Sequence, residues 1–169
     1  MAQVTLQGKT VNLVGRVPAV GRKAPDFRLV DGALKNRSLS DYAGKKKVIS
    51  VVPSLDTEVC AVSTRKFHEK LGERDDVVVL VVSVDTPFAQ KRFCTTENLD
   101  HVVPLSMIRN QFFGKDYGLL IMDGPLAGFL ARAVLVVDEE DNIIYQELVG
   151  EIAHEPDYEA VLKALGSSC

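Results

Sequence analysis

The segment KVISVVPSLDTEVC, residues 47–60, places a cysteine a few residues after an apolar run rich in β-branched side chains. Residues 46–52 are typical of a buried strand, because valine and isoleucine fit a pleated, covered surface. Pro53 ends that strand, since proline cannot donate a ladder hydrogen bond. Residues 58–72 then show helical periodicity. We therefore predict a strand, a short polar turn, and a helix that carries Cys60 in its first turn.

Outward from this unit, strand and helix patterns alternate along the chain. Residues 77–84 are almost continuously apolar, which is typical of a central strand that is covered on both faces. Pro87 begins a predicted helix over residues 87–97. The remaining elements are a strand at 102–105, a helix at 109–117, a strand hairpin at 131–137 and 142–149, and a helix at 156–165. Because strand–helix–strand crossovers are right-handed, strands 46–52 and 77–84 should run parallel.

The N-terminal part predicts smaller elements: a β-hairpin over residues 3–14, a short strand at 27–30 and one helical turn at 39–43. The order along the chain is then β-α-β-α, a β-hairpin and a last helix. This order predicts an α/β fold of the thioredoxin-like kind, with a central mixed β-sheet flanked by helices. We expect a single domain over residues 1–169, with the N-terminal hairpin and an insertion around residues 98–130 as additions.

The composition excludes several classes of protein. The chain has 169 residues, of which 46% are hydrophobic and 25% charged, as in ordinary globular domains. A formal net charge of -3 gives no sign of a nucleic-acid partner or of a membrane surface. The longest apolar run, residues 77–82, is much shorter than the ~20 residues that span a bilayer. Since residues 1–4 show no secretory signal, we expect the protein to be cytoplasmic.

Cys60 lies where the topology favours chemistry. Sites in open α/β sheets gather at the carboxyl ends of the strands, where the predicted strand 46–52 ends. A helix N-terminus offers unpaired N–H groups and a partial positive charge, which favour a thiolate over a thiol. Asp56 or Thr57 can cap this helix and leave a polar group beside the sulfur. Burial is the alternative, because Cys60 shares a helix face with Phe67 and free cysteine is often a core residue.

Arg132 shifts the balance between these alternatives. It opens the predicted strand 131–137, which should run antiparallel to strand 46–52, so that its start lies at the edge that holds Cys60. A guanidinium at the mouth of an apolar strand is costly unless it is paired. A thiolate is a suitable partner, which the arginine would stabilise. The alternative is an arginine in a surface salt bridge.

The other cysteines have weaker signals, and three cysteines are too few for a disulfide scaffold. Cys94 falls about two turns into helix 87–97, a rise of roughly 11 Å, so it is near Cys60 in the plan of the fold but not in contact. A disulfide needs Cα atoms within about 7 Å, so a bond between them would require partial unwinding. The alternative is an isolated, half-exposed cysteine. Cys169, the last residue, is interpreted as a free thiol without a catalytic role.

The three histidines, His68, His101 and His154, are widely scattered along the chain. No Cys/His spacing resembles a zinc site, so we expect no bound metal. His68 falls in the middle of the predicted helix, too far along it to be an obvious base for Cys60. The absence of a nearby histidine argues against a Cys–His hydrolase.

Several motifs resemble those of a known family. The pattern Pro53-x-x-x-Thr57-x-x-Cys60, followed by an arginine that opens a later strand, resembles the active site of peroxiredoxins, as does the entry segment Ala24-Pro25-Asp26-Phe27. The stretches PSLDTEVCAVSTRKF, PFAQKRFC, YGLLIMDGPLAGFLARAVLVVDEEDNIIY and EPDYEAVLKAL are similar to those of the bacterial thiol peroxidase subgroup, which is of the atypical two-cysteine type. The resemblance covers about residues 3–165.

The resemblance implies a role for each matching residue. Cys60 would be the peroxidatic cysteine, which attacks the terminal peroxide oxygen and becomes a sulfenic acid. Thr57 would bind and orient the peroxide, and Arg132 would hold the thiolate and stabilise charge in the transition state. Pro53 would shield the sulfur from water. Cys94 would be the resolving cysteine, which condenses with the sulfenic acid to form an intrachain Cys60–Cys94 disulfide.

The family also implies partners. Thioredoxin would reduce the disulfide by thiol exchange, and no metal, haem or flavin cofactor would be needed. Homodimers, hydrogen peroxide and alkyl hydroperoxides as substrates, and a role in antioxidant defence and redox homeostasis are further expectations from the family. Glu58 departs from the pattern, because the subgroup often has a small residue there, and its charge would oppose a thiolate if it pointed at Cys60.

Two other functions stay open at this point. A general thiol–disulfide oxidoreductase is weakened because Cys60 is followed by Ala61, Val62 and Ser63, so that no C-x-x-C motif exists. A peroxide sensor that passes its disulfide to a partner protein would use the same two cysteines. Catalytic turnover would distinguish a sensor from an enzyme.

Overall fold

The structure is a computed structural model that describes residues 2–166 of the chain, so Cys169 lies outside the described residues. The strands are β1 (Gln3–Leu6), β2 (Lys9–Asn12), β3 (Leu29–Val30), β4 (Asn36–Arg37), β5 (Lys46–Val51), β6 (Val77–Ser83), β7 (Val102–Ser106), β8 (Ala133–Val137) and β9 (Ile143–Leu148). The helices are the 3-10 helix η1 (Leu39–Tyr42), α1 (Glu58–Leu71), α2 (Pro87–Thr96), α3 (Phe112–Asp116) and α4 (Tyr158–Leu165).

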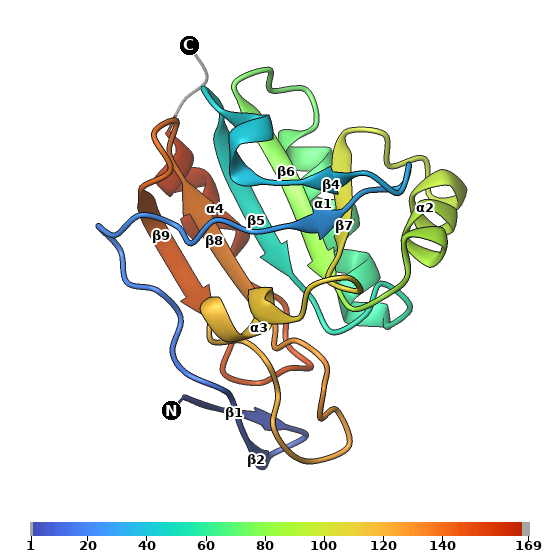
Figure 1. Ribbon diagram of the computed structural model, residues 1–169, viewed down its shortest axis with the longest axis vertical. Helices are drawn as coiled ribbons and strands as arrows, with labels where there is room; N and C mark the ends of the chain where they lie inside the picture. The colour runs from blue at the N-terminus through green and yellow to red at the C-terminus, as the bar shows by residue number, and fades with distance from the viewer. Residues whose placement is uncertain (1, 167–169) are drawn as a thin grey trace.

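Among the described residues, seven strands form one sheet in the order β4-β3-β7-β6-β5-β8-β9 (Figure 1). β5 lies in its centre, parallel to β6 and antiparallel to β8, as the sequence predicts. β7 is parallel to β6, and β9 is antiparallel to β8. The predicted mixed sheet is thus confirmed, and the end of β5 and the start of β8 lie side by side.

The alternating side chains of the central strands divide the core between the two faces of the sheet. On one face, Val48, Val79 and Val134 pack with Phe67 of α1 and Val161 of α4. Figure 1 shows both helices behind the sheet. Cys60 belongs to this cluster, so α1 buries the side of its first turn that carries the thiol.

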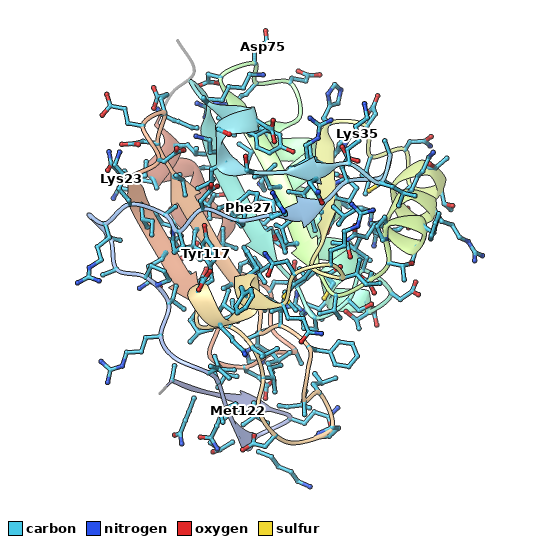
Figure 2. The ribbon with its side chains drawn as sticks, in the orientation of Figure 1. Lys23, Phe27, Lys35, Asp75, Tyr117 and Met122 are labelled. Atoms are coloured by element: carbon cyan, nitrogen blue, oxygen red, sulfur yellow. The ribbon has the colours of Figure 1, made fainter. Side chains whose placement is uncertain are left out.

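The opposite face is covered by irregular chain and by α3 (Figure 1). Tyr117 lies on this face with Phe27, as Figure 2 shows, and its hydroxyl donates a 2.6 Å hydrogen bond to the Pro25 carbonyl. The Tyr117 ring stacks on Phe113, with ring centroids 4.4 Å apart. Burial raises the pKa of Tyr117 far above its usual range. These contacts fix the long entry segment across the sheet before β5 begins.

The N-terminal hairpin β1–β2 is present as predicted, and it is tied to two distant segments. The Thr5 N–H donates to the Gly150 carbonyl at 2.8 Å, and the Ile152 N–H donates to the Thr5 carbonyl at 2.9 Å. The Met122 N–H donates to the Asn12 carbonyl at 2.8 Å. The hairpin therefore closes one end of the molecule around the loop after β9 and the segment before β8.

Two local predictions differ from the structure. The two-residue strand β4 was not predicted, because Asn36 and Arg37 have no strand propensity of their own. It forms because the Asp31 carboxylate accepts hydrogen bonds from the Lys35 N–H and Arg37 Nε, which fold the chain back onto β3. α3 is also shorter than the predicted 109–117 helix. Across residues 2–166, none of the helices has the length and apolar character needed to cross a membrane.

Candidate active site

Cys60 lies in the first turn of α1, immediately beyond the carboxyl end of β5. Its side chain is fully buried, with a relative exposure of 0%. Its carbonyl oxygen accepts hydrogen bonds from the hydroxyls of Ser63 at 3.0 Å and Thr64 at 2.8 Å. Both predicted features of this residue, burial and a place at a helix N-terminus, are therefore found together.

Arg132 immediately precedes β8 and lies beside Cys60. Its Nη2 is 3.1 Å from the Cys60 Sγ, and its Nε donates a 2.9 Å hydrogen bond to the Ile152 carbonyl. The side chain is only 3% exposed. The antiparallel pairing of β5 and β8 brings these two residues together from positions 72 apart in the sequence.

The pairing has an electrostatic consequence. A buried guanidinium keeps its proton, so it needs negative charge or several acceptors around it. Its hydrogen-bond partners within residues 2–166 are a neutral carbonyl and the Cys60 sulfur, and its buried Nη1 has no partner among these residues. The Cys60 sulfur is therefore the side-chain acceptor that this cation contacts, and one N–H group of the guanidinium is left to bind another acceptor.

The turn between β5 and α1 is held by an acid that the sequence analysis missed. The Asp85 carboxylate accepts hydrogen bonds from the Ser54 hydroxyl at 2.7 Å and from the Leu55 N–H at 2.8 Å. It also accepts one from the Ser83 hydroxyl at 2.7 Å. Asp85 lies two residues after the end of β6, at the carboxyl edge of the sheet, and that position was the available signal.

Thr57 is the N-cap residue of α1, but its side chain does not cap the helix. The Thr57 hydroxyl instead donates a 2.9 Å hydrogen bond back to the Ser54 carbonyl, which closes the turn. The predicted side-chain cap is therefore wrong for Thr57. Pro53, at the other end of the turn, is buried two residues after the end of β5, which agrees with its predicted role in ending the strand.

A pocket of about 410 Å³ is lined by Arg132 together with both ends of this turn. The other residues that line it are Leu6, Pro53, Ser54, Thr57, Glu58, Val59, Leu126, Phe129, Ile152 and Ala153. Most of these side chains are apolar, and they come from the hairpin, the turn, the segment before β8 and the loop after β9. The pocket can therefore receive a polar group near Arg132 and an apolar body beyond it.

Glu58, the residue that departs from the family pattern, is exposed at the pocket, whereas Cys60 is fully buried. Within residues 2–166, the Glu58 carboxylate makes no hydrogen bond or ion pair. His68 lies two turns further along α1, and its Nε2 is 3.3 Å from an Asp100 carboxylate oxygen. That position agrees with the expectation that His68 is not a base for Cys60.

Cys94 lies apart from this group. It is half-buried in the last turn of α2, and it lines a different cavity, of about 750 Å³, with Lys91, Asn98 and Pro104. Burial raises the pKa of the Cys94 thiol to about 11. Cys60 and Cys94 both carry free thiols. The structure thus brings together Pro53, Thr57, Cys60 and Arg132 but not Cys94.

Comparisons with known proteins agree with this geometry. The family model described as Redoxin matches residues 19–162. The chain is 50% identical over 167 residues to the thiol peroxidases of Mycobacterium tuberculosis (strain ATCC 25618 / H37Rv) and Mycobacterium bovis (strain ATCC BAA-935 / AF2122/97), covering 99% of this chain and 100% of each relative.

Two solved structures are similar over nearly the whole chain. A peroxiredoxin-like protein from Aquifex aeolicus superposes with a TM-score of 0.90 at 41% identity, covering 98% of this chain and 96% of that one. A thiol peroxidase from Chromobacterium violaceum has a TM-score of 0.90 at 25% identity, covering 96% and 94%. The predicted thioredoxin-like, peroxiredoxin-type fold is confirmed by these structures.

Proposed function

This chain belongs to the redoxin family and to its thiol peroxidases, and from that premise we propose that Cys60 is the residue that attacks the hydroperoxide. Membership makes the protein a peroxiredoxin-type enzyme that uses a peroxide substrate and a thiol reductant. The contact between Arg132 Nη2 and Cys60 Sγ, at 3.1 Å, is the observation that carries the proposal. It sets a positively charged side chain against the Cys60 sulfur, and the same side chain lines the pocket proposed for the substrate.

In the first step, the Cys60 thiolate attacks the terminal oxygen of the hydroperoxide. A sulfur–oxygen bond forms, the oxygen–oxygen bond breaks, and the alkoxide takes a proton from water to leave as an alcohol. Cys60 becomes a sulfenic acid. Arg132 would stabilise the negative charge as it moves from sulfur to the departing oxygen, and its Nη1–H, which has no hydrogen-bond partner within residues 2–166, would donate to the peroxide.

Thr57 and Pro53 line the pocket on the side of the turn. Thr57 would hold the hydroperoxide group, because its hydroxyl oxygen can accept a hydrogen bond from the peroxide O–H while the hydroxyl donates to the Ser54 carbonyl. Pro53 presents no N–H group, so it excludes water from the sulfur without competing for the substrate. Pro53, Thr57 and Arg132 would therefore act together around Cys60.

The substrate class follows from the rest of the pocket. The pocket is also lined by the apolar side chains of Leu6, Val59, Leu126 and Phe129, which suit the carbon chain of an alkyl hydroperoxide. Hydrogen peroxide fits the polar end but gains nothing from this surface. We propose that the enzyme reduces both and favours alkyl hydroperoxides.

Cys94 is proposed as the resolving cysteine. Its thiol condenses with the Cys60 sulfenic acid, a sulfur–sulfur bond forms and water leaves. The dithiol of thioredoxin would then reduce the disulfide and become oxidised itself. α2 is suited to the movement this requires, because only Pro87 and Gln90 of its residues are buried, whereas Phe88 is 70% exposed. Local unwinding of α2 therefore gives up little buried surface.

A homodimer is part of the same proposal. Ile108 and Phe112 are 52% and 64% exposed on neighbouring turns before and within α3. Burial of such side chains against a second copy would remove apolar surface from water. Light scattering after size exclusion would give the mass of the assembly, and a Phe112→Asp variant should shift it toward the monomer.

A coupled assay tests the enzymatic proposal. The protein is mixed with thioredoxin, thioredoxin reductase and NADPH, and NADPH oxidation is followed after cumene hydroperoxide or hydrogen peroxide is added. We expect consumption that depends on both protein and peroxide, with a higher kcat/KM for the alkyl substrate, and a background rate for Cys60→Ser. Consumption that persists in Cys60→Ser would contradict the assignment of the nucleophile.

A further inference from the structure

The fold brings together two histidines that the sequence keeps apart. His68 lies in α1, and His101 lies in the connection between α2 and β7, directly after Asp100. The two imidazole rings have centroids 5.3 Å apart and are tilted by 31°. Although they are far apart along the chain, packing of the α2–β7 connection against α1 makes them neighbours in space.

Both rings direct the same nitrogen at one carboxylate oxygen. The Asp100 Oδ1 is 3.3 Å from His68 Nε2 and 3.7 Å from His101 Nε2. One ligand atom from each of the three residues lies within 4.8 Å of the other two. Zinc binds imidazole nitrogen and carboxylate oxygen at about 2.0–2.1 Å, so the edge of its coordination tetrahedron is about 3.3 Å. The spacing is close to what one ion would require.

Part of the framework behind these ligands is fixed. The His68 side chain is only 20% exposed, so its imidazole is held against the protein. His101 lies over Gly72 at the end of α1, where an added Cβ would come within 3.1 Å of the His101 Cβ. Asp100 is 81% exposed and can adjust its carboxylate to complete the site. Only modest side-chain movement is needed for all three groups to reach one ion.

We propose that His68, Asp100 and His101 form a site for a divalent cation of the zinc class. Two imidazoles select against calcium and magnesium, which take mainly oxygen ligands, and favour a borderline ion such as Zn²⁺. Three protein ligands leave one tetrahedral position for water. The site lies outside the pocket of Cys60 and Arg132, so it adds a function to the proposed enzyme rather than restating its chemistry.

Occupation of this site would act on Cys94, a consequence that rests on the proposed resolving role of that residue. The Leu99 N–H donates a 2.8 Å hydrogen bond to the Cys94 carbonyl, and Asp100 and His101 follow directly. Asp100 also lines the cavity that contains Cys94. An ion that joins this connection to His68 would hold the end of α2 against α1. It would therefore slow the unwinding that lets Cys94 reach Cys60.

Calorimetric titration with ZnCl₂ tests the site itself. A variant with Cys60→Ser, Cys94→Ser and Cys169→Ser removes thiols as competing ligands, and circular dichroism checks that it folds. We expect one zinc per chain, and His68→Gln and His101→Gln should each weaken binding by at least about 10-fold, since even outer-shell changes cost that much. His154→Gln, a histidine outside the cluster, is the matched control and should bind as its parent does.

Cobalt spectra identify the ligands independently of affinity. Co²⁺ in a tetrahedral nitrogen–oxygen site gives visible d–d bands, which zinc should abolish by displacement in the thiol-free protein but which should be absent in His68→Gln. Equal zinc affinity in the parent and both histidine variants would overturn the site. Because this protein lacks Cys60, the result does not depend on the peroxidase proposal.

The expected effect of zinc on Cys94 is tested with protein that keeps its cysteines. After one equivalent of hydroperoxide, formation of the disulfide is followed by quenched mass analysis with and without ZnCl₂. Zinc should slow disulfide formation more in the natural sequence than in His101→Gln, in which zinc bound to thiols is unchanged. An equal effect of zinc on both proteins would contradict the proposal that the ion holds the end of α2 against α1.

Discussion

Cys60 lies in the first turn of α1, whereas Cys94 lies in the last turn of α2. The N-terminal end of a helix favours negative charge and the C-terminal end opposes it. Cys60 is fully buried and receives a hydrogen bond from Arg132. Cys94 is half-buried, and burial raises its pKa to about 11, so it stays a neutral thiol at neutral pH. The surroundings of Cys60 thus suit the proposed nucleophile, and those of Cys94 keep its sulfur as a neutral thiol.

The supports of the two cysteines differ in the same direction. Around Cys60, β5 and β8 are central strands of the sheet, and Asp85 fixes the turn before α1. Around Cys94, α2 packs mainly against β7 and exposes much of its surface. The nucleophile is therefore on a rigid frame, and its proposed partner is on an element that can open. Substitutions that change the surroundings of one cysteine at a time test this contrast.

The largest effect on turnover should come from removal of the Cys94 thiol. Cys94→Ser should leave one rapid oxidation of Cys60 but should stop recycling by thioredoxin, because no intrachain disulfide forms. Single-turnover fluorescence and the coupled NADPH assay measure the two steps separately. Normal steady-state turnover of Cys94→Ser with thioredoxin would remove Cys94 from the mechanism, and Cys169→Ser is the control with an unrelated thiol.

Loss of the Arg132 guanidinium beside Cys60 should have the next largest effect. Arg132→Met keeps the apolar part of the side chain but removes the charge and the donors beside Cys60. The rate of Cys60 oxidation should fall about 100-fold or more, the usual cost of losing a donor that stabilises developing charge. Arg132→Lys should recover only part of the loss, since an ammonium cannot contact the sulfur and the Ile152 carbonyl as the planar guanidinium does.

Asp85 tests whether the turn matters beyond stability. Asp85→Asn keeps the shape but weakens the hydrogen bonds to Ser54 and Leu55, so that Thr57 and the start of α1 are less well fixed. We expect a fall of about 10-fold in the rate of Cys60 oxidation, because small misplacements of reacting groups are costly. Asp76→Asn, which alters an acid at the opposite end of the sheet, should not change that rate.

The smallest effect is a pH dependence at Cys94. Its folded pKa of about 11 lies above that of an unfolded cysteine, so the folded state holds the proton more tightly. This stabilisation is fully present below about pH 8.5 and is lost as the pH rises toward 11. The free energy of unfolding, measured with urea, should therefore fall more across this pH range for the natural sequence than for Cys94→Ser. Parallel curves for the two proteins would show that Cys94 is not desolvated.

Much of the rigid side could be predicted from the sequence, because it depends on local pattern and strand direction. β-branched residues and Pro53 identify the end of β5, and an antiparallel strand that begins at Arg132 must start at the same edge of the sheet. These signals placed Cys60 and Arg132 together. They did not show that Arg132 also binds the Ile152 carbonyl, because that contact depends on how the loop after β9 folds.

The contacts that the sequence did not predict depend on how the chain packs in three dimensions. The Thr57 hydroxyl has two acceptable partners, and the geometry of the turn selects the Ser54 carbonyl over the helix N–H groups. Asp85 is one of several acids near strand ends, and its partners lie 30 and 31 residues earlier. His68 and His101 meet because α1 and the α2–β7 connection are packed together. None of these contacts has a periodic signal in the sequence.

The contrast between the two cysteines is tested most directly by mass mapping after one equivalent of hydroperoxide. The protein is oxidised, alkylated to block remaining thiols and digested without a reductant. We expect a linkage between Cys60 and Cys94 with Cys169 alkylated. A linkage between Cys60 and Cys169, or oxidation that begins at Cys94 while Cys60 stays reduced, would contradict it.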